Sequence, residues 1–162
     1  MPFTPFHMGP GLLVKAGLQG AFSLMVFGWS QILIDLQPLY VLYTGQGELH
    51  GFSHTYLGAI LIAPVAAVSG KYLGEFALTR MRLGSFNPIR WPVAIFSAFA
   101  GTLSHVLIDS ILHADMAPLA PWSTHSALWR IVNSETLHLL CLVSAIIGAA
   151  GFFLVRHFRK PR

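Results

Sequence analysis

The sequence predicts an all-α, polytopic membrane protein, and two observations support this fold class. Charged residues make up 10% of the 162 residues, whereas a soluble domain carries about 25%. The deficit is concentrated in four uncharged runs, at residues 16–34, 55–70, 92–108 and 136–155. Each run approaches the roughly 17–25 residues that a helix needs to cross a bilayer. A soluble bundle would need polar outer faces on these helices, and few positions supply them.

We therefore expect one integral membrane domain over residues 1–162 with four main transmembrane helices. The predicted segments are spans at about 16–36, 54–72, 92–112 and 135–156, a cytoplasmic loop at 73–91 and a basic tail at 156–162. The second span reaches full length only if Lys71 extends its ammonium group to the membrane surface. Ser134 is expected to cap the start of the last helix.

Basic residues lie mainly on one side of this topology. Residues 71–91 and the tail after residue 155 hold Lys71, Arg80, Arg82, Arg90, Arg156, Arg159, Lys160 and Arg162. The opposite loops, 37–54 and 113–135, hold only Arg130. The positive-inside rule makes the basic side cytoplasmic. These basic residues do not alternate with stacking aromatics, so we expect lipid headgroups as their partners and no nucleic acid.

The amino-terminal segment allows two arrangements. If the first helix is a single span from residue 16, His7 lies on the cytoplasmic side. If residues 6–17 form a short helix that turns near Lys15, His7 returns towards Asp35 as part of a hairpin. The hydropathy pattern allows both.

Ionisable residues gather at the other ends of the predicted spans. His105 and Asp109 lie four apart inside the third span and share a helix face. A charge in hydrocarbon costs roughly 2.5–3.5 kcal/mol, so such residues indicate functional sites. Asp35 ends the first span and His54 opens the second on this same side. The remaining titratable groups at this depth are His113, Glu135 and His138.

Histidine and aspartate together are typical ligands of zinc, iron, nickel or manganese. Each group also has a simpler interpretation. The His105–Asp109 contact can fix helix packing, Asp35 can end its span among headgroups, and His54 can cap a helix. The other histidines can be ordinary loop or interface residues: His50, His113, His125 and His138.

Four segments, in order, resemble one family: MPFTPFHMGPG at residues 1–11, HGFSHT at 50–55, GTLSHVLID at 101–109 and PLAPW at 118–122. Together they are similar to the YdjM-type family of inner-membrane-bound metal-dependent hydrolases. The resemblance covers most of residues 1–125. It implies a small helical membrane protein whose shared histidines and aspartates hold a divalent metal ion, and we expect zinc or manganese.

Residue by residue, the resemblance implies the metal ligands His7, Asp35, His54, His105 and Asp109. The match at the amino-terminal histidine favours the hairpin arrangement of the first segment. Two positions depart from the family pattern, because Gln37 replaces a second acidic residue and His50 stands where arginine is common. Further candidate ligands are His50, His113 and His138.

Three functions remain open from the residues. The first is a metal-dependent hydrolase that cleaves an ester or phosphoester, of a lipid or a small molecule, at the outer face of the membrane. The second is ion or metal transport, although the inner halves of the predicted spans lack polar groups to continue a pathway. The third is a non-enzymatic structural membrane protein. The family resemblance favours the hydrolase.

Overall fold

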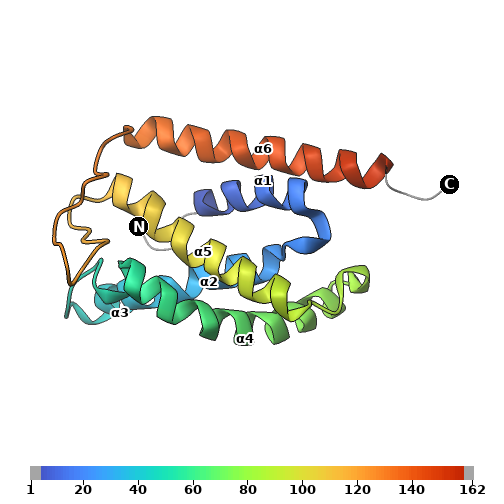
Figure 1. Ribbon diagram of the computed structural model, residues 1–162, viewed down its shortest axis with the longest axis horizontal. Coiled ribbons are helices and arrows are strands. Elements are labelled where there is room, and N and C mark those ends of the chain that lie inside the picture. Colours follow the sequence, from blue (N-terminus) through green and yellow to red (C-terminus); the bar gives the residue numbers. More distant parts are fainter. Residues whose placement is uncertain (1–4, 159–162) are drawn as a thin grey trace.

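The computed structural model describes residues 5–158, and their regular elements are all helices (Figure 1). Four helices are long and apolar enough to cross a membrane: Leu24–Thr44, Tyr56–Arg80, Trp91–Leu112 and Ser134–Phe158. The first of these consists of α2 (Leu24–Ile34) and α3 (Leu36–Thr44), and the others are α4, α5 and α6. The predicted all-α fold with four main transmembrane helices is confirmed.

The amino-terminal segment is a separate helix that forms a hairpin with α2. α1 (Met8–Leu18) and the short η2 (Gln19–Ala21) lead into the chain reversal before α2 (Figure 1). The first span therefore begins at Leu24 rather than at residue 16. Ser23 marks this start, because its hydroxyl accepts a hydrogen bond from the amide of Val26, as an N-cap residue does.

Lys15 stabilises the turn between α1 and α2. Its ammonium group donates hydrogen bonds to the carbonyl oxygens of Gln19 at 2.7 Å and Phe22 at 2.6 Å. Carbonyl groups at the end of a helix lack partners within the helix, and a lysine can supply them. Because the chain reverses here, His7 lies at the same end of the protein as Asp35. The structure adopts the hairpin arrangement.

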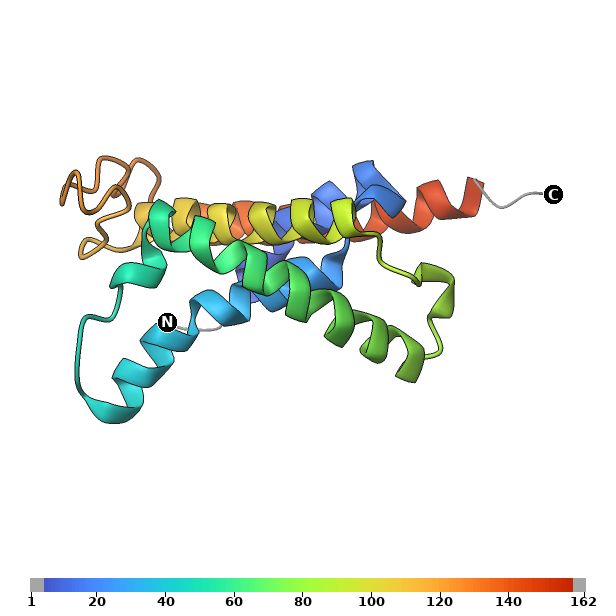
Figure 2. The ribbon, with the colours of Figure 1, turned by 60° about the horizontal axis from the view of Figure 1, so that its bottom comes forward.

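α2 and α3 are separated at Asp35, and Pro38 explains the break. A proline has no amide N–H, and its ring displaces the carbonyl four residues earlier, which here belongs to Ile34. Figure 2 shows α3 leaving the direction of α2 beyond this point. α3 ends at Gly45, whose φ of 70° lies in the left-handed region that favours glycine. The break leaves Asp35 at a helix junction.

α4 (Tyr56–Arg80) is longer than the predicted span, and the loop after it is correspondingly shorter than residues 73–91. Thr55 caps its start by accepting a hydrogen bond from the amide of Gly58 at 2.9 Å. At the other end Lys71 forms an ion pair with Glu75. Glu75 also accepts a hydrogen bond from the amide of Ile89 at 2.9 Å. These contacts give the charged residues partners inside the helix, so the helix continues past them.

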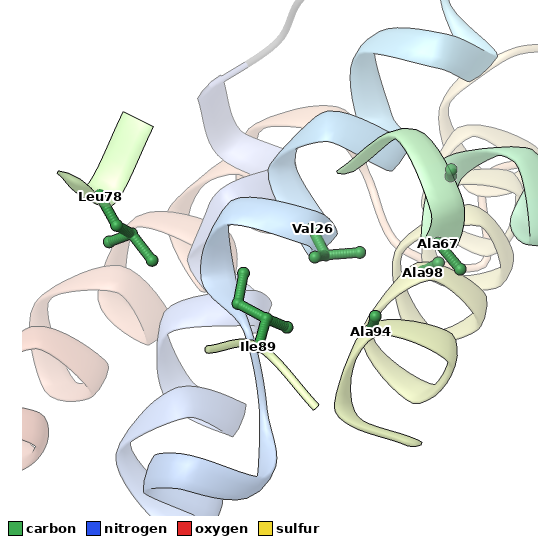
Figure 3. Close-up of a cluster of buried hydrophobic side chains, with 7 residues drawn as sticks. Val26, Ala67, Leu78, Ile89, Ala94 and Ala98 are labelled. Carbon is green, nitrogen blue, oxygen red and sulfur yellow. The ribbon is translucent and has the colours of Figure 1, made fainter. Parts of the chain in front are cut away.

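The core between α2, α4 and α5 includes several alanines, whose small side chains let the three helices approach closely. Figure 3 shows Val26, Ala67, Leu78, Ile89, Ala94 and Ala98, which form this buried cluster together with Ala66. Gly101 of α5 lies against Ser30 and the backbone of Phe27, where an added Cβ would collide. The contact between α2 and α5 therefore depends on a glycine.

α6 (Ser134–Phe158) packs chiefly on α1 (Figure 1). Gly9 of α1 lies against the backbone of Cys141, and Gly148 of α6 lies against the backbone of Leu12. Only 11% of the most apolar window of α6 is buried inside the protein. The remaining apolar surface of this helix suits contact with lipid.

The two ends of the bundle differ in character. The α1–α2 turn, the α4–α5 loop and the end of α6 lie at one end, on the right in Figure 1, and the loops at 45–55 and 113–133 lie at the other. The first end carries Lys15, Lys71, Arg80, Arg82, Arg90 and Arg156. The tail residues Arg159, Lys160 and Arg162 lie outside the described residues.

Candidate metal centre

Four segments meet at the end of the bundle opposite these basic residues. They are η1 (Pro5–His7), the α2–α3 junction, η3 (Phe52–His54) and the second half of α5 (Trp91–Leu112). Their side chains form one buried group, called here the His–Asp cluster: His7, Asp35, His54, His105 and Asp109. None of the five residues is more than 5% exposed. The structure thus brings together all five residues that the family resemblance implies as ligands.

Two imidazoles face two carboxylates in this cluster. His105 Nε2 lies 3.2 Å from Asp35 Oδ1 and 3.1 Å from Asp109 Oδ2. His54 Nε2 lies 3.5 Å and 3.4 Å from the same two oxygens. Bonds of about 2.0–2.2 Å to one ion would separate neighbouring ligand atoms by about 3.0–3.6 Å. These four distances lie in the range for atoms that share one metal ion, and Asp35, His54 and His105 offer ligand atoms that all lie within 4.8 Å of one another.

Gln31 sets the orientation of the His105 ring. The amide nitrogen of Gln31 donates to the carbonyl of Gly101 at 3.2 Å, so its oxygen faces the ring. His105 Nδ1 then donates to Gln31 Oε1 at 2.6 Å. In a neutral imidazole with a proton on Nδ1, Nε2 carries a lone pair. Nε2, with this lone pair, is the His105 atom that faces Asp35 and Asp109.

Ser53 and Gln37 hold His54 in a similar way. Ser53 Oγ lies 2.9 Å from His54 Nδ1, which leaves Nε2 for the cluster. The amide of Ser53 donates to Gln37 Oε1 at 2.7 Å. Gln37 replaces the second acidic residue of the family pattern, and here it anchors the loop that carries His54. Residues that hydrogen-bond to metal-binding histidines without contacting the metal commonly orient those histidines.

Two Nε2 atoms of the cluster are placed to bind a cation. His54 Nε2 and His105 Nε2 are buried and make no hydrogen bond of good geometry among the described residues, although carboxylate oxygens of Asp35 and Asp109 lie between 3.1 and 3.5 Å away. Such atoms are costly unless something satisfies them. When ionised, the carboxylates of Asp35 and Asp109 place two negative charges in this buried setting, and a divalent cation would neutralise them. The cluster can hold a metal ion.

The second oxygen of Asp109 faces other histidines. Asp109 Oδ1 lies 3.0 Å from His7 Nε2 and 3.9 Å from His113 Nε2. The His7 ring stacks on the His105 ring with centroids 4.4 Å apart. His7, His105 and Asp109 offer ligand atoms within 4.8 Å of one another. The hairpin of α1 thus brings His7 into the cluster.

A second layer of residues covers the cluster on the loop side. The rings of His50 and His113 stack with centroids 4.2 Å apart, and His50 Nδ1 lies 2.8 Å from Asp115 Oδ2. Burial would raise the pKa of Asp115, but the hydrogen bond from His50 holds that pKa below its usual range. Burial lowers the pKa of His113. His50 and His113, two of the further candidate ligands, therefore lie near the His–Asp cluster.

His138, the third further candidate, is not brought into the cluster. Its Nδ1 lies 2.7 Å from the carbonyl oxygen of Ser134, so it donates within its own helix. The His138 ring packs edge-on against Phe6, with centroids 4.7 Å apart. Because α6 packs on α1 rather than on α5, the first turns of α6 stay away from the carboxylates. The structure therefore does not bring His138, predicted as a possible additional ligand, to the other candidate ligands.

Sequence reasoning missed the residues that orient the ligands: Gln31, Ser53 and Asp115. A signal existed for Gln31, which lies four residues before Asp35 and is an amide in an otherwise apolar helix. Residues at this spacing share a helix face. The roles of Ser53 and Asp115 depend on loops, whose conformation has no comparable period.

Comparison with protein-family models, with curated proteins and with solved structures finds no match. The resemblance to the YdjM-type family stays a prediction from the motifs, and the functional argument rests on the geometry of the cluster.

Proposed function

We propose that this protein is a metal-dependent hydrolase of a bacterial inner membrane. The metal ligands are Asp35, His54, His105 and Asp109, with His7 against the second oxygen of Asp109. The proposal is carried by the buried Nε2 atoms of His54 and His105, which make no hydrogen bond among the described residues and lie 3.1–3.5 Å from carboxylate oxygens of Asp35 and Asp109. The motifs that resemble YdjM-type hydrolases support the same reaction class.

Zinc is the metal that the cluster favours. Tetrahedral zinc with bonds of about 2.0–2.1 Å has ligand atoms about 3.3 Å apart. The four nitrogen-to-oxygen distances extend from 3.1 to 3.5 Å, on both sides of that value. Two imidazoles and two carboxylates also suit manganese, which prefers more oxygen ligands. Manganese is therefore the second choice.

Hydrolysis would need a position for water beside the four protein ligands, which zinc can provide by expanding to five ligands. The metal would then act as a Lewis acid that lowers the pKa of this water towards about 7. The protein's own residues hold the site in place for this chemistry. Gln31 fixes the His105 ring and Ser53 contacts the His54 ring. Asp35 and Asp109 supply negative charge in a buried setting, where electrostatic interactions are strong. Such preorganisation is a main source of catalysis.

The position of the cluster suggests where the substrate comes from. It lies at the end of the bundle opposite Lys71, Arg80 and the other basic residues, which the positive-inside rule assigns to the cytoplasm. At the cluster end, α3 exposes Tyr40 and Tyr43, and the loop at 113–133 exposes Trp122 and Trp129. Aromatic side chains of this kind anchor a protein at the membrane surface. We infer an ester or phosphoester substrate that arrives from the outer leaflet.

Ion transport is less well supported by the residues below the cluster. A pathway across the membrane would need further ligating side chains. The buried hydroxyls there bond to backbone instead: Ser30 donates to the Phe27 carbonyl at 2.7 Å, and Ser97 accepts from the Ser23 amide at 2.8 Å. These groups serve the packing of α2 and α5.

The test combines metal analysis with a substrate screen on the full chain in detergent. We expect wild-type protein to bind zinc stoichiometrically and to hydrolyse at least one ester or phosphoester in a panel of lipids and small molecules. His105→Ala and Asp109→Asn should lose both properties. His157→Ala, which changes an exposed histidine at the far end of α6, is the matched control and should keep both.

Two results would contradict the proposal. Wild-type protein that binds neither zinc nor manganese would exclude the metal site. Stoichiometric metal without hydrolysis of any substrate, together with metal movement into vesicles, would favour transport.

A further inference from the structure

Asp109 presents its two carboxylate oxygens to two different sets of histidines. Oδ2 faces His54 and His105 at 3.4 and 3.1 Å. Oδ1 faces His7 at 3.0 Å and His113 at 3.9 Å. One oxygen thus belongs to the buried ligand set already described, and the other points to a second group of imidazoles. A carboxylate with this arrangement is suited to bridge two ions.

The second group has the features of a metal site of its own. His50, Asp109 and His113 offer ligand atoms that all lie within 4.8 Å of one another. His50 also packs edge-on against His54, with ring centroids 5.2 Å apart, so the second group adjoins the first. Three such groups are enough for a metal site that keeps a further position open.

Asp115 supplies an independent observation at this second group. His50 Nδ1 donates to Asp115 Oδ2 at 2.8 Å, and the His50 side chain is 5% exposed. A carboxylate behind a histidine is the common second partner of metal-binding imidazoles, because it fixes the ring and raises the basicity of the other nitrogen. The remaining nitrogen of His50, Nε2, is left for a ligand.

The two positions also differ in access. The side chains of His54 and His105 are 1% exposed, whereas that of His113 is 28% exposed. The second position therefore lies at the rim of the cluster, beside the loop that follows α5. A substrate arriving from this side would meet the second position first.

We propose that Asp109 bridges two divalent metal ions, an inference that rests on the proposed metal-dependent function. The first ion is held by Asp35, His54, His105 and Asp109 Oδ2. The second is held by His50, His113 and Asp109 Oδ1, with His7 against the same oxygen. Two ions about 3.5–4 Å apart form the clamp by which many hydrolases hold both the attacking and the leaving oxygen. This pairing fits phosphoesters as the substrate class.

The experiment counts metal ions and measures their coupling, with Mn²⁺ as the probe. Full-length protein in detergent is titrated with Mn²⁺ and observed by electron paramagnetic resonance. We expect two ions per chain at saturation and a spectrum broadened by exchange between neighbouring ions. His113→Ala should bind one ion with the simple spectrum of isolated Mn²⁺. His125→Ala, which changes an exposed histidine in the same loop, should keep two coupled ions.

Asp115→Asn provides a variant that leaves every proposed ligand in place. Its second binding event should weaken by about 10–100-fold, while the first keeps the wild-type affinity. It also guards against misfolding of His113→Ala, because the Asp115 side chain is 59% exposed.

The outcomes separate this inference from the proposed function. If wild-type protein saturates with one uncoupled ion, and His113→Ala and Asp115→Asn bind it equally well, the bridge is excluded and the single-metal hydrolase stands. In that case the His50–Asp115 contact is an ordinary ion pair. If wild-type protein binds no metal, both the bridge and the proposed function fail.

Discussion

Gln31→Met should weaken metal binding with little effect on the fold. The substitution keeps the length of the side chain but removes the acceptor that holds His105 Nδ1 at 2.6 Å. The ring then loses the partner that places its proton on Nδ1 and its lone pair towards the carboxylates. Loss of such a partner costs about 10–100-fold in metal affinity. At about 1.4 kcal/mol per tenfold change, this equals about 1.4–2.8 kcal/mol of binding free energy.

The free energy of unfolding without metal should change much less. Hydrogen bonds between membrane helices contribute about 0.6 kcal/mol on average, so the metal-free variant should remain folded. Isothermal titration with zinc measures the metal affinity, and unfolding in mixed detergents measures the free energy of unfolding without metal. The contrast between them distinguishes a residue that orients a ligand from one that only joins two helices.

Ser69→Ala is the matched control for Gln31→Met. It removes a hydrogen bond of similar length between α2 and α4, in which Trp29 Nε1 donates to Ser69 Oγ at 2.8 Å. This bond is remote from the cluster, so zinc affinity should stay at the wild-type value. Wild-type affinity in Gln31→Met, or an equal loss in Ser69→Ala, would refute the role assigned to Gln31.

Three further predictions concern packing, metal and topology. Gly101→Ala should lower the free energy of unfolding by about 1–3 kcal/mol, because the added Cβ would collide with Ser30. Gly17→Ala is the control and should leave the free energy of unfolding unchanged, because the space around Gly17 is open. Equal denaturation midpoints for the two variants would contradict the collision. Zinc at 100 times its dissociation constant should stabilise wild-type protein by about 2.7 kcal/mol, seen as a rise in Tm that a chelator reverses; an unchanged Tm would argue against a site in the folded state. In intact cells Thr124→Cys should react with a membrane-impermeant thiol reagent and Gly84→Cys should not, and the reverse pattern would invert the proposed orientation.

The helical class and the membrane setting were predictable because both depend on local composition. An apolar run of the right length needs no partner to indicate a span. Small residues such as Ala66, Ala67 and Gly148 lie in close contacts between helices. The first and last residues of the helices were less predictable. α4 continues to Arg80 because Lys71 and Glu75 pair within the helix, which a search for uncharged runs does not detect.

The residue types of the site were also readable from the sequence, because ionisable groups in apolar helices are costly and therefore conspicuous. His105 and Asp109 could be placed on one face from their spacing alone. His7 could not be placed by hydropathy, because its side of the membrane depends on whether the chain turns after α1. That turn is stabilised by Lys15, whose carbonyl partners are revealed only by the folded backbone.

The sequence by itself determined an apolar helical protein with histidines and aspartates at one end of its spans, because hydropathy and helical period are properties of neighbouring residues. The tertiary structure decided which of those groups meet. It brought His7 to Asp109, kept His138 on the surface of α6, and turned the two oxygens of Asp109 towards different histidines. These outcomes depend on how α1, α5 and α6 pack, since contacts between residues up to 102 positions apart have no local pattern.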